Sequence, residues 1–400
     1  MSNKIQSYSL TKTAAYIGYV VQAVVINFSP MLFVTFMSEY GLSIEQVSFL
    51  VTAAFAVQFS VDFLSVFLIR RISYRALACV AHVLTATGLM LMAWLPDVMP
   101  AFLGLITATV LYSAGGGIIE VIAGPVIESC PAKNKSAQMS LLHSFYCWGQ
   151  VITVLFSTLF FVIFGLSEWR TLALLWALIP LTDLVLFLIC PMNVAEQTEK
   201  SASLPKLFRN ADFLIIMLII MCSGASELAV SQWASAYCET GLGVSKTVGD
   251  IAGPMAFALC MGGSRLVYSL CASRLKLERV MLLSGFLCVV GYLVITRSVS
   301  PIIGLFGFAI CGFAVGVLWP GAFSLAAKHV DGGASMFALL SFSGDAGCTL
   351  GPTLAGLFAA MKSDDIQFGI ACASVFPAVM CAALICLMLR LMSKRKSNER

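Results

Sequence analysis

The sequence predicts an all-α integral membrane protein with twelve transmembrane helices arranged as two related six-helix bundles. Hydrophobic residues make up 60% of the chain and charged residues only 11%, whereas a soluble domain carries roughly a quarter charged residues. The mean hydropathy is +0.94. The chain also has one long polar interval near its middle, and weak internal similarity relates its two halves. Together these observations indicate a duplicated helical bundle in a lipid bilayer.

The polar interval covers residues 191–210, PMNVAEQTEKSASLPKLFRN. It contains no apolar run long enough for a core element, and Ser, Pro and charged residues are frequent in it. We therefore expect a cytoplasmic linker at 191–210, with an N-terminal six-helix bundle at 1–190 and a C-terminal six-helix bundle at 211–400.

Gly, Pro and charge clusters divide each half into six apolar stretches. A hydrocarbon core about 30 Å thick requires about 20 mostly apolar residues per helix, and each stretch is of that order. In the first half the predicted helices cover residues 13–37, 46–69, 76–95, 101–127, 137–164 and 171–190. In the second half they cover residues 211–237, 247–272, 280–297, 301–327, 334–360 and 367–391.

The placement of Lys and Arg supports this division, because positive residues near helix ends collect on the cytoplasmic side. With both termini cytoplasmic, 19 of the 24 Lys and Arg residues fall in inner segments and 4 in outer ones, while Arg265 lies within a helix. The net charge of +4 follows from this bias and indicates no nucleic-acid partner. We expect a multi-pass protein of the inner or plasma membrane that functions as a monomer.

The two halves repeat one another weakly but in the same order. Placing residues 55–75 over 258–278 pairs Asp62 with Arg265 and Arg71 with Arg274. Likewise, MSLLHSFYCWGQ of the first half matches MFALLSFSGDAG of the second at Met, Leu, Ser and Phe. Parallel halves of this kind, with a solute site at mid-depth, are a known transporter plan.

Three motifs of the chain are GGGIIEVIAGP, SLLHSFYCWG and GASELAVSQWASAY. They are similar to the Gly-rich-Glu, Leu-His-x-Phe and Glu-x5-Trp-x3-Tyr patterns of the fucose permease-like proton symporters, a group of the major facilitator superfamily, and the resemblance to this superfamily covers the whole chain. The superfamily signature between the second and third helices appears in degraded form as VFLIRRISYR, in which Arg70 replaces the usual Asp and Ser73 the second Gly. The resemblance implies two bundles related by a pseudo-twofold axis, a cavity lined by helices 1, 4, 7 and 10, and alternating access.

Ionisable groups at membrane depth are functional candidates, because each costs about 2.5 to 3.5 kcal/mol on insertion scales. We assign proton coupling to five such residues: Asp62, Glu120, Glu227, Arg265 and Asp345. His82 lies on the third helix, which is peripheral in this fold, and we interpret both His82 and Asp183, on the sixth helix, as structural. Arg265 requires an acidic or aromatic partner, and the superfamily packing places it near His143 and places Asp62 near Asp345.

Glu120 follows three consecutive glycines on a helix that the resemblance places at the cavity. A carboxyl there can take a proton from one side and release it to the other. Alternatively, it is bonded permanently to hydroxyls or to Arg265 and only fixes the helices. Glu227 has Trp233 and Tyr237 on the same helix, and a carboxylate beside aromatic rings suits a sugar. Ordinary interface anchoring is the alternative for Trp233 and the preferred interpretation for Tyr237.

A wider set of polar and aromatic residues has the chemistry to bind a polyol by hydrogen bonding and stacking. The candidate solute-binding residues are Gln22, Asn27, Glu120, His143, Tyr146, Gln150, Glu227, Trp233 and Trp319. For gating, we expect Arg71 and Arg75 to pair with Glu128 in the first half, while Arg274 lies near Glu278 in the second. Simple topology signalling by positive charge is a compatible interpretation of these arginines.

The sequence thus favours a secondary active transporter that imports a small hydroxylated solute such as a sugar, driven by protons, with sodium as the alternative ion. A proton-driven exporter of drug-like molecules is the alternative function. No H-E-x-x-H, G-x-S-x-G or Walker motif indicates an enzyme or an ATP-driven pump. The 14 cysteines are scattered singly and form no C-x-x-C, so we expect neither a metal nor another cofactor.

Overall fold

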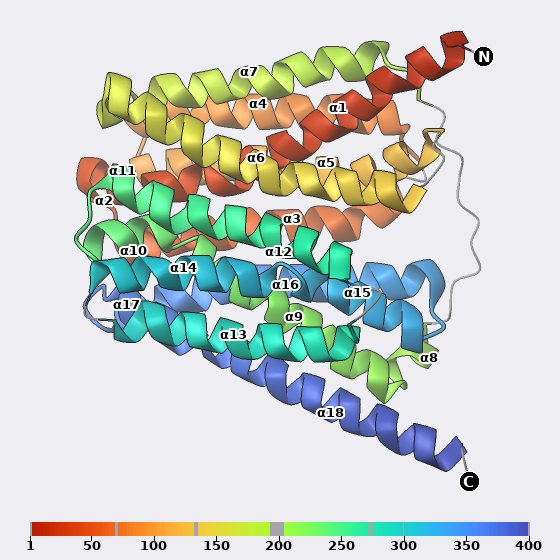
Figure 1. The fold of residues 1–400 in the computed structure, drawn as a ribbon. Helices are drawn as coiled ribbons and strands as arrows, with labels where there is room; N and C mark the ends of the chain where they lie inside the picture. Colours follow the sequence, from red (N-terminus) through yellow and green to blue (C-terminus); the bar gives the residue numbers. More distant parts are fainter. Residues whose placement is uncertain are drawn as a thin grey trace. The chain divides into compact units, whose positions relative to one another are not determined.

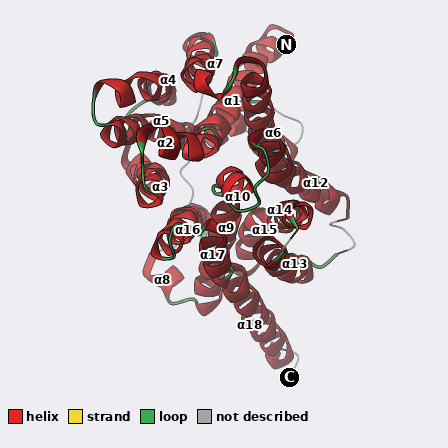
Figure 2. Ribbon diagram, turned by 90° about the vertical axis from the view of Figure 1, so that its left-hand side faces the viewer, coloured by secondary structure: helices red, strands yellow, loops and turns green. Residues whose placement is uncertain are grey.

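The computed structural model describes residues 2–68, 71–131, 135–192, 204–271, 275–298 and 300–398. Every regular element of these residues is a helix (Figures 1 and 2). The chain divides into two compact units, Met1–Glu196 and Gln197–Arg400, and the division falls inside the predicted linker. Part of that interval forms a short helix, α8, Leu204–Phe208, and Leu207 of this helix is buried.

Unit 1 contains six helical stretches at the predicted places. Helix α1 packs on α5, α6 and α7, while α4 packs on α5 and α7, and α3 packs on α5. The elements are α1 Ser2–Asn27, η1 Ser29–Leu32, α2 Phe33–Tyr40, α3 Ile44–Leu68, α4 Tyr74–Val98, α5 Ala101–Ser129, α6 Lys135–Phe164, η2 Leu166–Glu168 and α7 Trp169–Ile189.

Unit 2 repeats this plan with more interrupted helices. Helix α9 packs on α16 and α18, α13 packs on α14 and α18, and α12 packs on α14. The elements after α8 are α9 Ala211–Ser231, α10 Ala234–Thr240, α11 Lys246–Asp250, η3 Ile251–Met255, α12 Ala256–Cys271, α13 Leu277–Arg297, α14 Pro301–Val315, α15 Leu318–His329, α16 Gly333–Met361, α17 Ile366–Ala373 and α18 Val375–Asn398.

Breaks divide several stretches that the sequence predicts as single helices. The first stretch is interrupted by a 3-10 turn that carries Pro30, because proline has no N–H to donate to the preceding turn. Pro254 lies within the π-helical turn η3 for the same reason. A further break lies at Gly316 and Val317, between α14 and α15, and the Gly316 carbonyl has no helical donor because residue 320 is a proline.

Ten helical stretches among the described residues are long and apolar enough to cross a membrane. The predicted spans at 247–272 and 334–360 are helical as well, in α11–α12 and α16, but are not among these ten. The multi-pass helical fold is therefore confirmed, whereas the predicted number of twelve spans is not.

Three consecutive glycines of α5 bring three neighbouring helices against it at one level. A Cβ on Gly115 would clash with Thr85 of α4, and one on Gly116 would clash with Gln22 of α1. A Cβ on Gly117 would lie 3.2 Å from Val61 of α3. Small residues of this kind let backbones in a bilayer approach closely. They also place the side chains of α1, α3 and α5 near one another, which matters for the site below.

Gly115→Ala is expected to lower the free energy of unfolding by about 1 to 3 kcal/mol, because the added methyl group has no room against the α4 backbone. Its Cβ would lie 2.7 Å from the amide nitrogen of Thr85. The matched control is Gly124→Ala on the same helix, where the nearest atom is the Met139 methyl at 4.0 Å. Denaturant unfolding in detergent measures both, and equal losses would contradict the packing argument.

Candidate functional site

In unit 1 a carboxyl group on α5 is bonded to an amide on α1. The side-chain N–H of Gln22 donates to a Glu120 carboxyl oxygen at 2.8 Å. Gln22 is only 2% exposed, whereas Glu120 is exposed. Glu120 precedes the Ser129 end of α5 by nine residues, or roughly 14 Å at 1.5 Å per residue. An exposed carboxyl so far from a helix end indicates an aqueous pocket or crevice rather than lipid.

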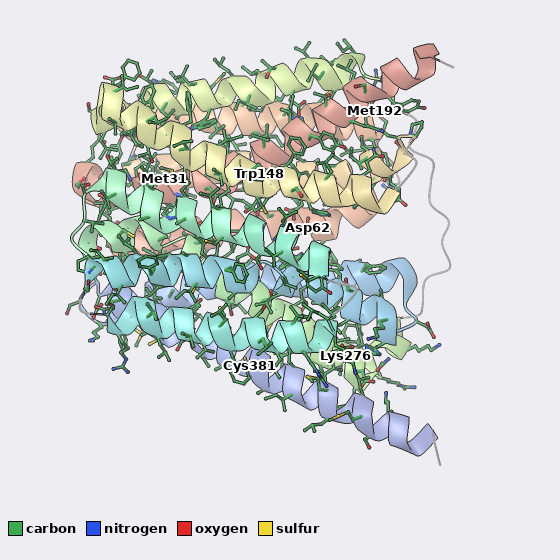
Figure 3. The ribbon with its side chains drawn as sticks, viewed as in Figure 1. Met31, Asp62, Trp148, Met192, Lys276 and Cys381 are labelled. Carbon is green, nitrogen blue, oxygen red and sulfur yellow. The ribbon has the colours of Figure 1, made fainter. Side chains whose placement is uncertain are left out.

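Helix α3 adds a second carboxyl and a second amide to this group. Asp62, labelled in Figure 3, is half-buried and lies within electrostatic range of Glu120. Gln58 lies one turn earlier on α3, is 5% exposed, and has its side-chain nitrogen 3.4 Å from where a Gly116 Cβ would be. Two carboxylates this close repel when both are ionised, and one proton removes the repulsion.

Tyr19 and His143 complete the group from α1 and α6. Their rings meet edge to face, with centroids 5.4 Å apart and planes at 81°. Tyr19 is 6% exposed and lies within electrostatic range of Glu120, whereas His143 is exposed. Sequence reasoning missed Tyr19 and Gln58. The available signal for Tyr19 was its position three residues before Gln22, which places both on one face of a helix.

In unit 2 the corresponding charged residues are Glu227 on α9 and Arg265 on α12. Both are half-buried, and Arg265 lies within electrostatic range of Glu227. The Arg265 Nε–H also donates to the Gly316 carbonyl at 3.0 Å. That carbonyl is available because residue 320, four positions on, is a proline with no N–H to donate to it.

A tryptophan ring lies beside this pair of charges. Trp319 of α15 is half-buried, and its ring packs against Gly224 of α9 and Gly344 of α16, where a Cβ on either glycine would be too close. Gly224 lies one turn before Glu227 on the same helix. The half-buried Asp345 follows Gly344 on α16. Unit 2 therefore presents an aromatic ring, a carboxylate and an arginine within one region.

The comparisons with known proteins decide the family. The family model of the Major Facilitator Superfamily matches residues 15–352. The chain belongs to this superfamily. As a superfamily member it is a multi-pass membrane transporter, and the transport prediction is confirmed at that level.

Solved structures of other superfamily transporters share the fold at low sequence identity. A nucleoside transporter mutant has a TM-score of 0.76 at 12% identity, covering 94% of this chain and 99% of that chain. A D-xylose-proton symporter has a TM-score of 0.76 at 14% identity, covering 95% and 97%. The E. coli fucose:proton symporter has a TM-score of 0.63 at 17% identity, covering 95% and 98%.

A curated sequence relative is an uncharacterized transporter of Sinorhizobium fredii, which is 27% identical over 175 residues. The match covers 43% of this chain and 46% of the relative, so the chain spans about half the length of that protein.

Two predicted solute-binding residues are buried and hydrogen-bonded within their own units. Trp233 is 1% exposed, and its indole N–H donates to the Pro352 carbonyl at 3.0 Å. It therefore packs within unit 2 and does not offer a stacking surface. Asn27 is 6% exposed and donates to the Ala23 carbonyl at 2.8 Å, which ends α1 before the proline turn. Both side chains are buried and bonded in this structure, and their roles in solute binding stay predictions.

Tyr237 also differs from its predicted place. Its side chain is fully buried, and its hydroxyl donates to the Ile295 carbonyl at 2.9 Å. An interface anchor would be partly exposed, so this interpretation is wrong. Tyr146 is half-buried against the core of unit 1, and Gln150 is 3% exposed on α6. Roles in solute binding for these last two residues stay predictions.

Among the predicted gating residues, Arg75 has partners other than the expected one. Arg75 donates to the carbonyls of Leu188 and Cys190, at 2.8 and 2.6 Å, so it caps α7 rather than pairing with Glu128. Arg71 and Glu128 are both exposed, and a contact between them stays a prediction.

In unit 2, Glu278 pairs with Lys328 of α15 at 2.6 Å. Arg274 lies outside the described residues. The expected proximities of Arg265 to His143 and of Asp62 to Asp345 each join one unit to the other and stay predictions. No group of three His, Cys, Asp or Glu residues suited to a metal occurs within the described ranges.

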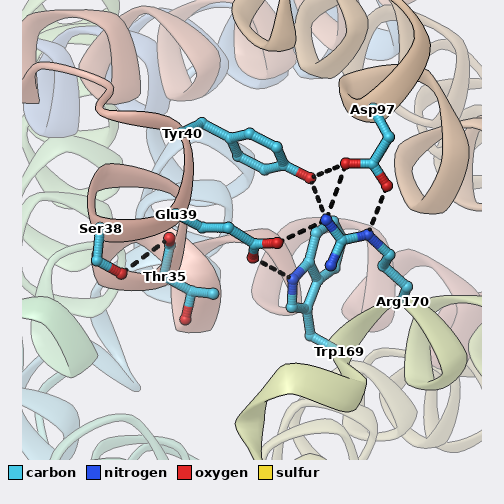
Figure 4. A network of polar contacts seen from close by, with 7 residues as sticks. All are labelled: Thr35, Ser38, Glu39, Tyr40, Asp97, Trp169 and Arg170. Carbon is cyan, nitrogen blue, oxygen red and sulfur yellow. Dashed lines mark hydrogen bonds and ion pairs between the residues drawn. The ribbon is translucent and has the colours of Figure 1, made fainter.

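Figure 4 shows a polar cluster that the sequence did not reveal, at the ends of α2, α4 and α7 in unit 1. Arg170 contacts Glu39 at 2.6 Å and Asp97 at 2.9 Å, and its guanidinium lies 4.6 Å from the centre of the Trp169 ring. Tyr40 donates to Asp97 at 3.0 Å. Sequence reasoning counted Arg170 only as a topology signal, because its partners are about 70 and 130 residues away in the chain.

Arg170→Ala is expected to lower the free energy of unfolding by about 1 to 2 kcal/mol, because it removes two charge pairs and a cation–π contact from one network. The control is Lys362→Ala, which removes one exposed pair with Asp365 at 3.2 Å and an exposed cation–π contact with the Phe368 ring at 4.6 Å. That control should cost less than Arg170→Ala, because it removes one charge pair rather than two. Denaturant unfolding in detergent compares the two. A loss for Lys362→Ala as large as that for Arg170→Ala would contradict a special contribution from the cluster.

Proposed function

We propose that the protein imports a small hydroxylated solute, such as a sugar, by alternating access coupled to protons. The observation that carries this proposal is the Glu120 group: an exposed carboxyl in the middle of an apolar helix, bonded to Gln22 and close to Asp62. A carboxyl that reaches water within the membrane and has a second carboxyl beside it is suited to binding and releasing a proton.

Gln22 suits such a group because its amide can serve both protonation states. When Glu120 is ionised, the amide N–H donates to the carboxylate, as in the structure. When Glu120 is protonated, a turned amide presents its carbonyl oxygen to the acid O–H. That oxygen is buried and has no hydrogen-bond partner among the described residues in the present arrangement. A turn of the amide would therefore satisfy it.

The solute class follows from the neighbouring chemistry. Hydroxyl groups donate strong hydrogen bonds to carboxylates, and the C–H face of a sugar packs on an aromatic ring. Unit 2 offers both types of group, in Glu227 and Trp319, and Arg265 offsets part of the charge of Glu227. Superfamily members named as transporters of xylose, fucose and nucleosides share the fold, and all three solutes carry several hydroxyl groups.

The membrane orientation is part of the proposal. The bias of Lys and Arg favours cytoplasmic termini and residence in the inner or plasma membrane. The protein is proposed to act as a monomer with one solute and one coupling ion. Sodium is the alternative to the proton, and uptake with and without each gradient distinguishes the two ions.

Glu120→Gln is expected to abolish accumulation of the solute against its gradient while exchange of labelled solute remains measurable, because the amide binds no proton at this position. Proteoliposomes with an imposed pH gradient measure accumulation, and counterflow measures exchange. The matched control is Glu45→Gln, an exposed carboxyl at the start of α3, which should transport as the wild type does. Unchanged accumulation in Glu120→Gln would remove this residue from coupling.

Glu227→Gln is expected to weaken solute binding about tenfold or more, because an ionised acceptor contributes roughly twice the energy of a neutral one to each hydrogen bond. A thermal-shift screen of sugars, nucleosides, amino acids and organic acids first identifies the ligand, and titration then gives the affinity. An affinity equal to that of the wild type would move the solute site away from Glu227.

A further inference from the structure

Unit 1 contains a second pair of titratable residues, away from the exposed Glu120 group. His82 of α4 and Asp183 of α7 lie 2.8 Å apart, between His82 Nε2 and Asp183 Oδ2, and both side chains are 0% exposed. His82 follows the start of α4 by eight residues, and Asp183 precedes the end of α7 by six. These distances place the pair roughly 9 to 12 Å inside the helices.

The contacts of the imidazole ring fix how many protons the pair holds. His82 Nδ1 lies 2.7 Å from the Ala78 carbonyl oxygen. A carbonyl oxygen only accepts hydrogen bonds, so Nδ1 carries a hydrogen. The close contact between Nε2 and the Asp183 oxygen then requires one further proton between them, either on the ring or on the carboxyl. Without it, two lone pairs would face each other at 2.8 Å.

The second Asp183 oxygen indicates which partner holds this proton. Oδ1 is buried and makes no hydrogen bond to any residue that the structure describes. A buried carboxylate with an unsatisfied oxygen is costly, whereas a neutral carboxylic acid bears the same loss at much lower cost. The arrangement therefore favours a neutral Asp183 whose O–H donates to a neutral His82.

The surroundings of the pair are mostly apolar. The Phe187 ring packs on the His82 ring with centroids 5.1 Å apart, and α1 presents Gly18 to Asp183. The titratable groups near Asp183 within the described ranges are His82 and Cys190. Arg75 lies within electrostatic range of Cys190, at the contact between α4 and α7. Arg75 lies two turns before His82 on α4 and is bonded to the end of α7. Two sets of contacts therefore join α4 to α7: the bonds of Arg75 at one end, and the His82–Asp183 pair about two turns farther along α4.

We propose that His82 and Asp183 form a second protonation site of the transporter, in which one proton is bound between Asp183 and His82 Nε2. Loss of this proton leaves facing lone pairs, so its release requires the α4–α7 contact to open or the ring to turn. The site therefore links proton binding to the packing of these two helices. This inference does not depend on the solute or on the coupling role of Glu120.

Asp183→Asn tests the proposal, because an asparagine N–H can donate to His82 Nε2 and keep the contact without a removable proton. In the wild type the folded state keeps the proton that an unfolded histidine loses above about pH 6.5. The folded-to-unfolded ratio should then fall about tenfold for each pH unit above that value, until the folded pair deprotonates. In Asp183→Asn this fall should be absent, while all other titrating groups contribute equally to both proteins.

Denaturant unfolding in detergent over a pH series gives both curves. Equal pH dependence for the two proteins would overturn the proposal and leave a purely structural hydrogen bond. Infrared difference spectroscopy of the wild type provides a second measurement if Asp183→Asn does not fold. A protonated-carboxyl band that persists in Glu120→Gln and disappears at high pH supports the site. The absence of any such band at neutral pH in Glu120→Gln would overturn it.

Discussion

The cost of placing a polar or charged group inside a bilayer is the constraint on which this structure depends. Each such group must reach water or find a partner. The chain uses both solutions within unit 1. Glu120 is exposed and bonded to one amide, whereas Asp183 is fully buried and bonded to a histidine. A carboxyl group therefore lies exposed at one position and fully buried in a pair with a histidine at another.

Glycines and helix breaks determine where these partners can meet. The three glycines of α5 admit α4, α1 and α3 at one level, which brings Gln22 and Gln58 to the carboxyl group. In unit 2, Pro320 leaves the Gly316 carbonyl without a helical donor near the break after α14, and this carbonyl accepts from Arg265. Interrupted helices in a membrane are tolerated where neighbouring side chains satisfy the freed backbone groups. The glycines and the helix breaks therefore lie beside the charged residues and supply their partners.

The two units differ in how they treat charge. Unit 1 places two carboxyls near each other, so a proton changes the balance of the group. Unit 2 places a carboxylate near an arginine, so its charge is partly offset without a proton. This division is consistent with a proton-exchanging group in one unit and a solute-binding group in the other. At the ends of the helices, Arg75 and Arg170 hold α7 to its neighbours through carbonyl and carboxylate contacts.

The sequence by itself determined the helical membrane class, the duplicated plan, the superfamily and the set of ionisable residues within the helices. These follow from composition, from helix length against bilayer thickness and from motif letters, none of which requires packing detail. Only the tertiary structure decided the partners: Gln22 for Glu120, His82 for Asp183, Leu188 and Cys190 for Arg75, and the burial of Trp233 and Tyr237. The physical reason is that a helix facing both lipid and protein is apolar all round. Its pattern therefore does not reveal which face meets which neighbour.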